Sequence, residues 1–334
     1  MGTMKRLAAN LPRGFGAAIG LIIAAVALVP ITWQLCGHWS EVGFYLARVN
    51  VKGLLAAQVL AVLDLGILAS AWLLIAGRLG IAVGIARHLK VFFVSNFAKR
   101  VPGLVWYVAA RAYVYRTVDG GAWMATTGTL LENALLFFAG MLLALVLWPH
   151  QLGLPRSWIS ASLLVSISIA VALSMYPAAL VRLVRVFHVG KAADAPKRGV
   201  VRLSARSVLS IIVLYTLVWL IGGVSLHCFV AAFDPSVSLA ALPFTISVSI
   251  VYSLTGFVAF VVPAGLGVKE LAGAYVLARL IPPPLAVAVM LLFRVNLLVA
   301  EGFWIVLSHC LERWSLRGVG ECADNHVGGR DESL

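Results

Sequence analysis

Charged residues are scarce in this chain. Only 12% of its 334 residues are Asp, Glu, Lys or Arg, whereas 62% are hydrophobic. A soluble domain has about 25% charged and about 45–50% apolar residues. This shortage of charge excludes a soluble globular protein, and no polar stretch between the apolar runs is long enough for a separate soluble domain. The sequence therefore predicts an integral membrane protein.

Sequence patterns typical of enzymes are also missing. The chain has no GxSxG, P-loop or dinucleotide-binding fingerprint. Its 13 acidic residues lie mostly near segment ends or in the C-terminal tail, and its seven histidines are scattered. The four cysteines have no paired spacing, which argues against both a zinc signature and a disulfide framework. These absences favour a protein that is not an enzyme and needs no cofactor or metal.

The basic residues are distributed unevenly. The net charge is +13, and most Lys and Arg residues fall in segments that the alternation of apolar runs places in the cytoplasm. Lys5, Arg6 and Arg13 precede the first apolar run, and residues 182–207 hold seven basic residues against Asp194 alone. An excess of basic residues in cytoplasmic loops sets the orientation of a membrane protein. We therefore expect a cytoplasmic N-terminus and no nucleic-acid partner.

Apolar runs define the organisation of the chain. Crossing a hydrocarbon layer of about 30 Å takes about 20 residues. Seven runs reach or approach this length: residues 17–35, 54–76, 123–148, 159–181, 208–230, 239–262 and 285–308. We expect a multi-pass protein of a bacterial inner membrane. Its predicted parts are a cytoplasmic N-terminus (1–16), one membrane domain (17–308) made of a first half (17–181), a basic cytoplasmic loop (182–207) and a second half (208–308), and a cytoplasmic tail (309–334).

Two similar stretches lie about half the chain apart. The first reads Val-Pro-Gly-Leu-Val-Trp at residues 101–106, and the second reads Val-Pro-Ala-Gly-Leu-Gly-Val-Lys-Glu at residues 262–270. An Ala-Tyr-Val sequence follows each of them about three helical turns later. Helix breakers in matching places of two halves point to a binding site built from interrupted helices.

The polar residues around the first breaker favour a re-entrant hairpin. Residues 91–116 are apolar but include Asn96 and four basic residues, which would be costly on a lipid-facing span. Charge placement makes this hairpin enter from the cytoplasm and the second one, over residues 239–280, enter from outside. The predicted fold is an all-α polytopic membrane protein of about seven to eight hydrophobic segments, with two interrupted or re-entrant elements in an inverted repeat.

Two charged residues interrupt apolar runs at corresponding distances after Pro102 and Pro263. They are Glu132 and Arg294. An ionised residue inside a membrane usually faces the protein interior and finds a partner. We expect these two to face one another or a shared wet cavity. They form either a structural ion pair or a site for a substrate or proton.

Residues near the breakers complete the candidate binding site. Gly265 and Gly267 permit unusual backbone dihedrals, and the helix that they precede opens at Lys269, where free N–H groups and the lysine can hold a phosphate. Glu270 caps that opening or pairs with Lys269 or Arg279. In the first half Lys99, Arg100 and Arg111 are placed either to meet a lipid headgroup or only to anchor the chain at the cytoplasmic surface.

Asp64 interrupts the second apolar run. The sequence assigns it no partner, and a buried polar contact is the favoured interpretation.

At these residues the chain resembles the lysylphosphatidylglycerol synthase membrane-region family of flippase-like proteins. Residues 263–270 are similar to that family's late Pro-x-Gly-Leu-Gly-Val-basic-Glu motif, and Asn96, Pro102-Gly103, Val105-Trp106 and Arg111 resemble its earlier motif. Glu132 and Arg294 match the family's intramembrane Glu and Arg. The chain has no acid between Pro102 and Arg111, where many members carry Leu-Gly-Glu, so the role of that Glu is not transferred.

The resemblance implies a stand-alone membrane domain that moves or binds lipids, because the aminoacyl-transferase domain of the full synthases is absent from this sequence. We expect translocation of an anionic phospholipid or lipid-linked substrate between leaflets. The residues assigned to the substrate are Lys99, Arg100, Pro102, Gly103, Arg111, Glu132, Pro263, Gly265, Gly267, Lys269, Glu270 and Arg294. Two alternatives remain: a membrane-embedded enzyme or accessory subunit of lipid or glycan assembly, and a small-solute transporter. Another copy of the chain or a lipid-modifying enzyme is the expected protein partner.

Overall fold

The computed structural model describes most of the chain as α-helix. The described residues are 28–29, 32–33, 36–98, 104–118, 121–151, 157, 161, 164–166, 168, 204–258, 262 and 265–328, and they contain no β-strand. An all-α fold is thus confirmed for this part of the chain. The basic loop expected at residues 182–207 lies almost wholly outside it.

Five helices are long and apolar enough to cross a membrane. They are α4 (Val51–Leu79), α7 (Gly121–Gln151), α10 (Ala205–Phe233), α11 (Leu242–Val258, preceded by the 3-10 turn Leu239–Ala241) and α13 (Pro283–Gly328). Each coincides with one of the predicted apolar runs, so the chain is a multi-pass membrane protein. The other two predicted runs, 17–35 and 159–181, lie mostly outside the described residues.

Four shorter helices connect or flank these spans. They are α3 (Trp39–Leu46), α5 (Ile85–Phe97), α6 (Leu104–Tyr115) and α12 (Val268–Leu277). Helices α5, α6 and α12 have 13, 12 and 10 residues, too few to cross a membrane of ordinary thickness. Helix α5 ends just before the first predicted breaker and α6 begins after it, while α11 ends before the second breaker and α12 begins after it.

Local chemistry fixes where the helices begin and end. The side chain of Asn50 accepts hydrogen bonds from the backbone N–H groups of Lys52 and Gly53 at the start of α4, and Gly80 ends that helix in the left-handed conformation, with φ of 83°. Helix α13 begins at Pro283, where a proline is tolerated because the first helical N–H has no intrahelical partner. The Pro-Pro-Pro sequence at residues 282–284 thus forms the entry of this helix.

Small residues let the long helices approach closely. Helices α4 and α10 cross along much of their length, and an added Cβ at Gly53 would lie 2.9 Å from the Cβ of Ala232. Gly66 receives the ring of Trp304 from α13, and Gly140 receives the ring of Trp219 from α10. Close backbone approach at small residues is the usual means of helix association in membranes, where lipid tails are as apolar as the side chains.

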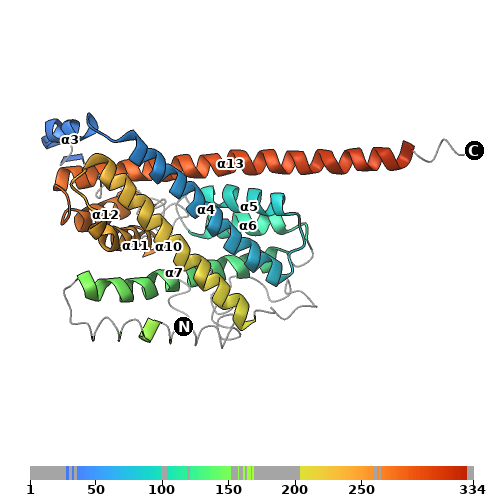
Figure 1. Cartoon of the computed structure of the whole chain (residues 1–334). Helices are drawn as coiled ribbons and strands as arrows, with labels where there is room; N and C mark the ends of the chain where they lie inside the picture. Colours follow the sequence, from blue (N-terminus) through green and yellow to red (C-terminus); the bar gives the residue numbers. More distant parts are fainter. Residues whose placement is uncertain are drawn as a thin grey trace, which may run out of the picture.

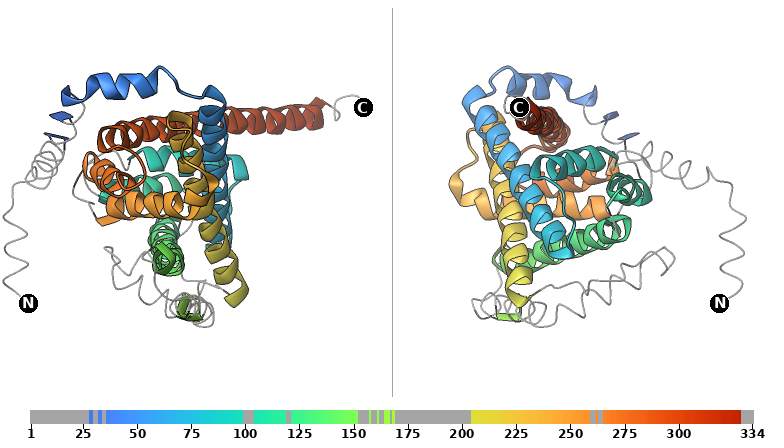
Figure 2. Two further views of the ribbon diagram at one scale, coloured as in Figure 1. Left: turned by 60° about the vertical axis from the view of Figure 1, so that its left-hand side comes forward. Right: turned by 90° about the vertical axis from the view of Figure 1, so that its right-hand side faces the viewer.

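The helices pack in two matching sets. Helices α7 and α13 lie on opposite sides of the short helices, and the C-terminal part of α13 projects beyond the other helices (Figures 1 and 2). Helix α7 packs on α4, α6, α10 and α11, and α13 packs on α4, α5, α10 and α12. Apart from the contact of α13 with α3, exchanging α4 for α10, α5 for α11, α6 for α12 and α7 for α13 reproduces the same neighbours.

Candidate functional site

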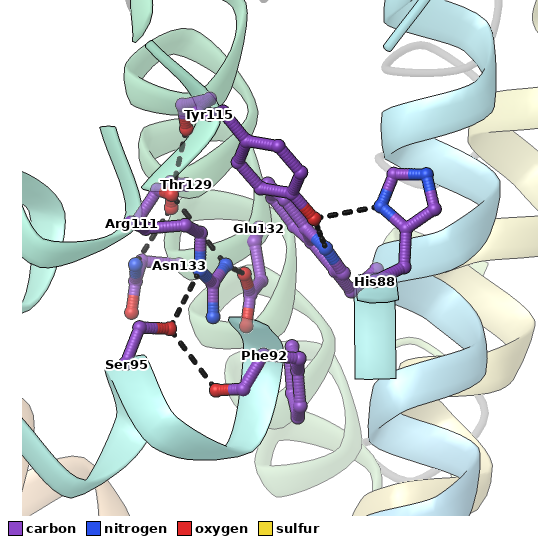
Figure 3. A network of polar contacts seen from close by, with 10 residues as sticks. His88, Phe92, Ser95, Arg111, Tyr115, Thr129, Glu132 and Asn133 are labelled. Carbon is purple, nitrogen blue, oxygen red and sulfur yellow. Dashed lines mark hydrogen bonds and ion pairs between the residues drawn. The ribbon is translucent and has the colours of Figure 1, made fainter. Parts of the chain in front are cut away.

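A buried ion pair joins α6 to α7. The guanidinium Nη1 of Arg111 donates to Oε2 of Glu132, and the two side chains are 0% and 2% exposed. Nε of Arg111 also donates to Oγ of Ser95 on α5, at 3.1 Å. Figure 3 shows the three side chains converging from three helices. An arginine enclosed in this way needs these partners, because an unpaired buried charge is very costly.

Aromatic rings surround the same guanidinium. Its central carbon lies 4.0 Å from the ring centroid of Trp72, 4.8 Å from that of Tyr107 and 5.0 Å from that of Phe92. Cations at these distances are attracted to the negative face of an aromatic ring. The rings and Glu132 together hold the charge of Arg111 away from lipid.

The polar contacts continue from this pair toward the start of α5. Nδ1 of His88 lies 2.6 Å from the hydroxyl oxygen of Tyr115, and Nε1 of Trp72 donates to the same oxygen at 3.4 Å (Figure 3). His88 is buried, and this burial lowers the pKa of its imidazole below 6.5, while a hydrogen bond with the backbone of Ile81 acts in the opposite direction. The imidazole is therefore neutral at physiological pH.

A second ion pair joins α12 to α13. Nη1 of Arg294 donates to Oε1 of Glu270 at 2.5 Å, and the side chains are 14% and 2% exposed. The other carboxylate oxygen of Glu270 accepts a hydrogen bond from the backbone N–H of Gly267, at 2.7 Å. Glu270 thus caps the start of α12, as the sequence predicted, and binds a cation with the same carboxylate.

Glu132 and Arg294 were expected to face one another or a shared wet cavity, and in the structure they do not form an ion pair with each other. Each of them instead binds an opposite charge from the short helix packed beside it, Arg111 in one half and Glu270 in the other. The reason is the packing, because α7 lies against α6 and α13 lies against α12. Glu270 was expected either to cap the start of this helix or to pair with Lys269 or Arg279, and it both caps the helix and pairs with Arg294.

The predicted glycines have the backbone conformations that only glycine adopts readily. Gly265 has φ of 64° and Gly267 has φ of 79°. Lys269, at the second position of α12, places its Nζ 4.7 Å from the ring centroid of Tyr252. Five predicted site residues, namely Lys99, Arg100, Pro102, Gly103 and Pro263, lie outside the described residues.

Some participants were not predicted from the sequence. Ser95, Trp72 and Phe92 contact Arg111, and the hydroxyl of Tyr252 donates to Glu270 at 3.5 Å. Apolar and hydroxyl residues are common throughout the chain, so nothing in the sequence distinguishes these four. Thr129 lies three residues before Glu132, a helical spacing that places both side chains on one face of α7, and Nη1 of Arg111 lies 3.5 Å from Oγ1 of Thr129.

Several buried polar atoms in the described part of the chain have no hydrogen-bond partner. They include Nη2 of Arg111, the hydroxyl of Tyr215 and Nδ2 of Asn296. Buried polar groups are normally paired with protein or water, so these atoms differ from the usual pattern. Among the described residues no three His, Cys, Asp or Glu side chains are grouped to hold a metal ion.

Comparison with known proteins gives one match. Residues 17–300 match a family model described as the lysylphosphatidylglycerol synthase TM region. No curated protein and no solved structure matches the chain.

Proposed function

Because the chain belongs to the lysylphosphatidylglycerol synthase TM region family, we propose that it translocates an anionic phospholipid or lipid-linked substrate between the leaflets of a bacterial inner membrane. The observation that supports this proposal best is the presence of one buried Arg–Glu pair in each half. Ionisable residues inside a membrane are expensive and usually serve a path for a charged substrate.

The two pairs are related by an exchange of charge. The short helix carries the arginine in the first half (Arg111) and the acid in the second (Glu270), and the following long helix carries the opposite charge. The matched packing of α4–α7 and α10–α13 supports an inverted repeat, as does the position of each pair after an interrupted element. In such a repeat, rocking one half against the other exposes each pair in turn.

Arg294 is the cation best placed to meet a headgroup. Its side chain is 14% exposed, and among the described residues its guanidinium donates one hydrogen bond, to Glu270. The remaining N–H groups are available to a phosphate, which arginine binds in a bidentate manner. Arg111 is fully enclosed and becomes available only if α6 and α7 separate.

The other predicted residues complete the route. Lys99 and Arg100, next to the first break, gather the headgroup from the cytoplasmic leaflet, with Pro102 and Gly103 forming one wall of the path. Pro263, Gly265 and Gly267 form the opposite wall, and Lys269 adds a second positive charge at the start of α12. Glu132 and Glu270 hold the arginines in place when no substrate is bound.

The test uses the purified protein in liposomes that contain fluorescent phosphatidylglycerol, with fluorescence quenched by a membrane-impermeant reductant. We expect faster loss of inner-leaflet fluorescence than in protein-free liposomes. Arg294→Gln should abolish the increase and Arg294→Lys should retain part of it. The matched control is Glu312→Gln, which removes the ion pair between Lys90 and Glu312 near the projecting end of α13.

Each outcome is informative. Unchanged exchange in Arg294→Gln with normal insertion rules out this headgroup site. A chemically altered lipid recovered from the liposomes favours the membrane enzyme, and uptake of a soluble solute without lipid exchange favours the small-solute transporter.

A further inference from the structure

Asp64 lies near the middle of α4, and its carboxyl group differs from the other intramembrane acids in its surroundings. Its Oδ1 atom is buried without a hydrogen bond, and within the described part of the chain the residue forms no ion pair. Two other acids inside the bundle, Glu132 and Glu270, are each paired with an arginine. An unpaired ionised carboxylate in this environment is costly, so Asp64 is chemically distinct from the other two acids.

The carboxyl group of Asp64 faces a gap left by a glycine. A Cβ added at Gly222 of α10 would lie 3.7 Å from Oδ1 of Asp64 and 3.7 Å from Oγ of Ser249 on α11. Three helices thus place a carboxyl, a hydroxyl and a bare backbone around one point. This point lies on the contact between α4 and α10, the helices that join the two halves.

The packing at the next residue, Gly223, shows that α10 is not loosely packed in general. A Cβ at Gly223 would lie 2.5 Å from Cγ1 and 2.6 Å from Cα of Ile246, so α10 and α11 touch there. The space beside Gly222 is therefore specific to the side of α10 that faces Asp64. It is polar on two sides and suits a proton or a water molecule.

We propose that Asp64 binds the proton that drives translocation, a proposal that depends on the function proposed above. Protonation converts the carboxylate and a proton into a neutral O–H group that can donate to Ser249 or to a water beside Gly222. Deprotonation leaves a charge that must attract water into the α4–α10 contact. The two protonation states therefore favour different packing of the two halves, which is how a proton gradient acts on a rocking motion.

The titratable groups described on the helices packed against α4 interact with other residues. The helices packed on α4 are α5, α7, α10 and α13. These interactions include His88 with Tyr115, Glu132 with Arg111, Arg294 with Glu270, Lys90 with Glu312 and, on α10, His227 with Thr245. Glu301 of α13 acts electrostatically on Tyr252 of α11. The phenol of Tyr215, two turns before Gly222 on α10, is neutral at physiological pH.

The first test does not depend on transport. An apolar carbodiimide adds to protonated carboxyl groups in membranes, and the adduct is located by mass spectrometry of the full-length protein after digestion. We expect labelling at Asp64 that increases up to about tenfold for each unit of decreasing pH, as the protonated fraction of a carboxylic acid does. Asp64→Asn must lose the label, whereas Glu41→Gln, which alters an exposed acid on α3, must keep it.

The second test measures coupling in the same liposomes. An imposed pH gradient should accelerate leaflet exchange by the wild-type protein and by Glu41→Gln, while Asp64→Asn should exchange lipid at a rate that the gradient does not change. The proton site is overturned if Asp64 is not labelled at any pH. It is also overturned if Asp64→Asn still responds to the pH gradient, or if leaflet exchange depends on a sodium gradient alone. If Asp64 is labelled but the protein shows no leaflet exchange, the proposed translocation function is overturned, while Asp64 is still shown to bind a proton.

Discussion

Arg111 on α6 and Glu132 on α7 form an ion pair in which neither side chain is more than 2% exposed. The pair belongs to the first half, and Glu270 and Arg294 repeat it in the second half with the charges exchanged between the helices. Because the arginine of the first pair is also enclosed by Trp72, Tyr107 and Phe92, we expect this pair to be the more rigid of the two.

Removing one partner of the enclosed pair should destabilise the protein strongly. Glu132→Gln leaves the guanidinium of Arg111 buried without a countercharge, which costs about 3–5 kcal/mol. Thermal unfolding in detergent should show a large decrease in Tm. The double variant Arg111→Met with Glu132→Gln should recover much of the loss, because it removes both charges. Equal or larger destabilisation of the double variant would contradict this interpretation.

Gly267 should not tolerate a side chain. Its φ of 79° lies where an L-residue is strained by about 1–2 kcal/mol, so Gly267→Ala should lower the free energy of unfolding by at least that amount. The strain should also displace the backbone N–H of Gly267, which donates a hydrogen bond to the side chain of Glu270. Gly302→Ala is the control, since nothing lies within 4 Å of a Cβ at this position in α13. Alanine there should be neutral or stabilising by up to about 1 kcal/mol.

Alanine substitutions at the two adjacent glycines of α10 should have very different effects on the stability of the protein. Gly223→Ala places a methyl group against the backbone of Ile246, and forcing the two helices apart should cost about 1–3 kcal/mol. Gly222→Ala meets its nearest atoms at 3.7 Å, an ordinary contact distance, and should leave stability almost unchanged. Unfolding of the two variants under identical detergent conditions checks the difference. Equal effects would show that α10 and α11 do not touch as described.

Acidification should destabilise the protein through His88, which lies on α5, outside the five candidate spans. Burial lowers the pKa of this imidazole in the folded protein below its unfolded value of 6.5. The unfolded chain therefore binds the proton at a higher pH, and stability is lost as the pH falls below about 6.5. Unfolding measured across this range should show a pH-dependent loss that is absent in His88→Gln. The control His309→Gln, at an exposed position on α13, should keep the wild-type profile.

Much of the fold could be predicted because membrane insertion depends on simple, local properties of the sequence. Length and hydrophobicity identify a span, and five of the predicted runs coincide with long helices. Breakers are also local, and the described helices lie on either side of them: α5 ends at Phe97 and α6 begins at Leu104, while α11 ends at Val258 and α12 begins at Val268. Gly267 and the cap by Glu270 follow from the same short-range rules.

The partners of the charged residues could not be predicted in this way. Glu132 and Arg294 are recognisable from the sequence as charges inside apolar runs, but their partners depend on which helices pack together. The same is true of the rings around Arg111, which come from α4, α5 and α6. Asp64 was recognisable as an interruption, and only the position of Gly222 on another helix shows the space that it faces.

The sequence by itself determined that this is a multi-pass helical membrane protein of a lipid-related family, with interrupted elements and a few intramembrane charges. These properties depend on single residues and short runs in contact with lipid or water. The tertiary structure alone decided that the charges pair within each half and that, among the described residues, Oδ1 of Asp64 has no hydrogen-bond partner. Pairing depends on distances between helices that are far apart in the chain, and those distances are set by the packing of small and large side chains throughout the bundle.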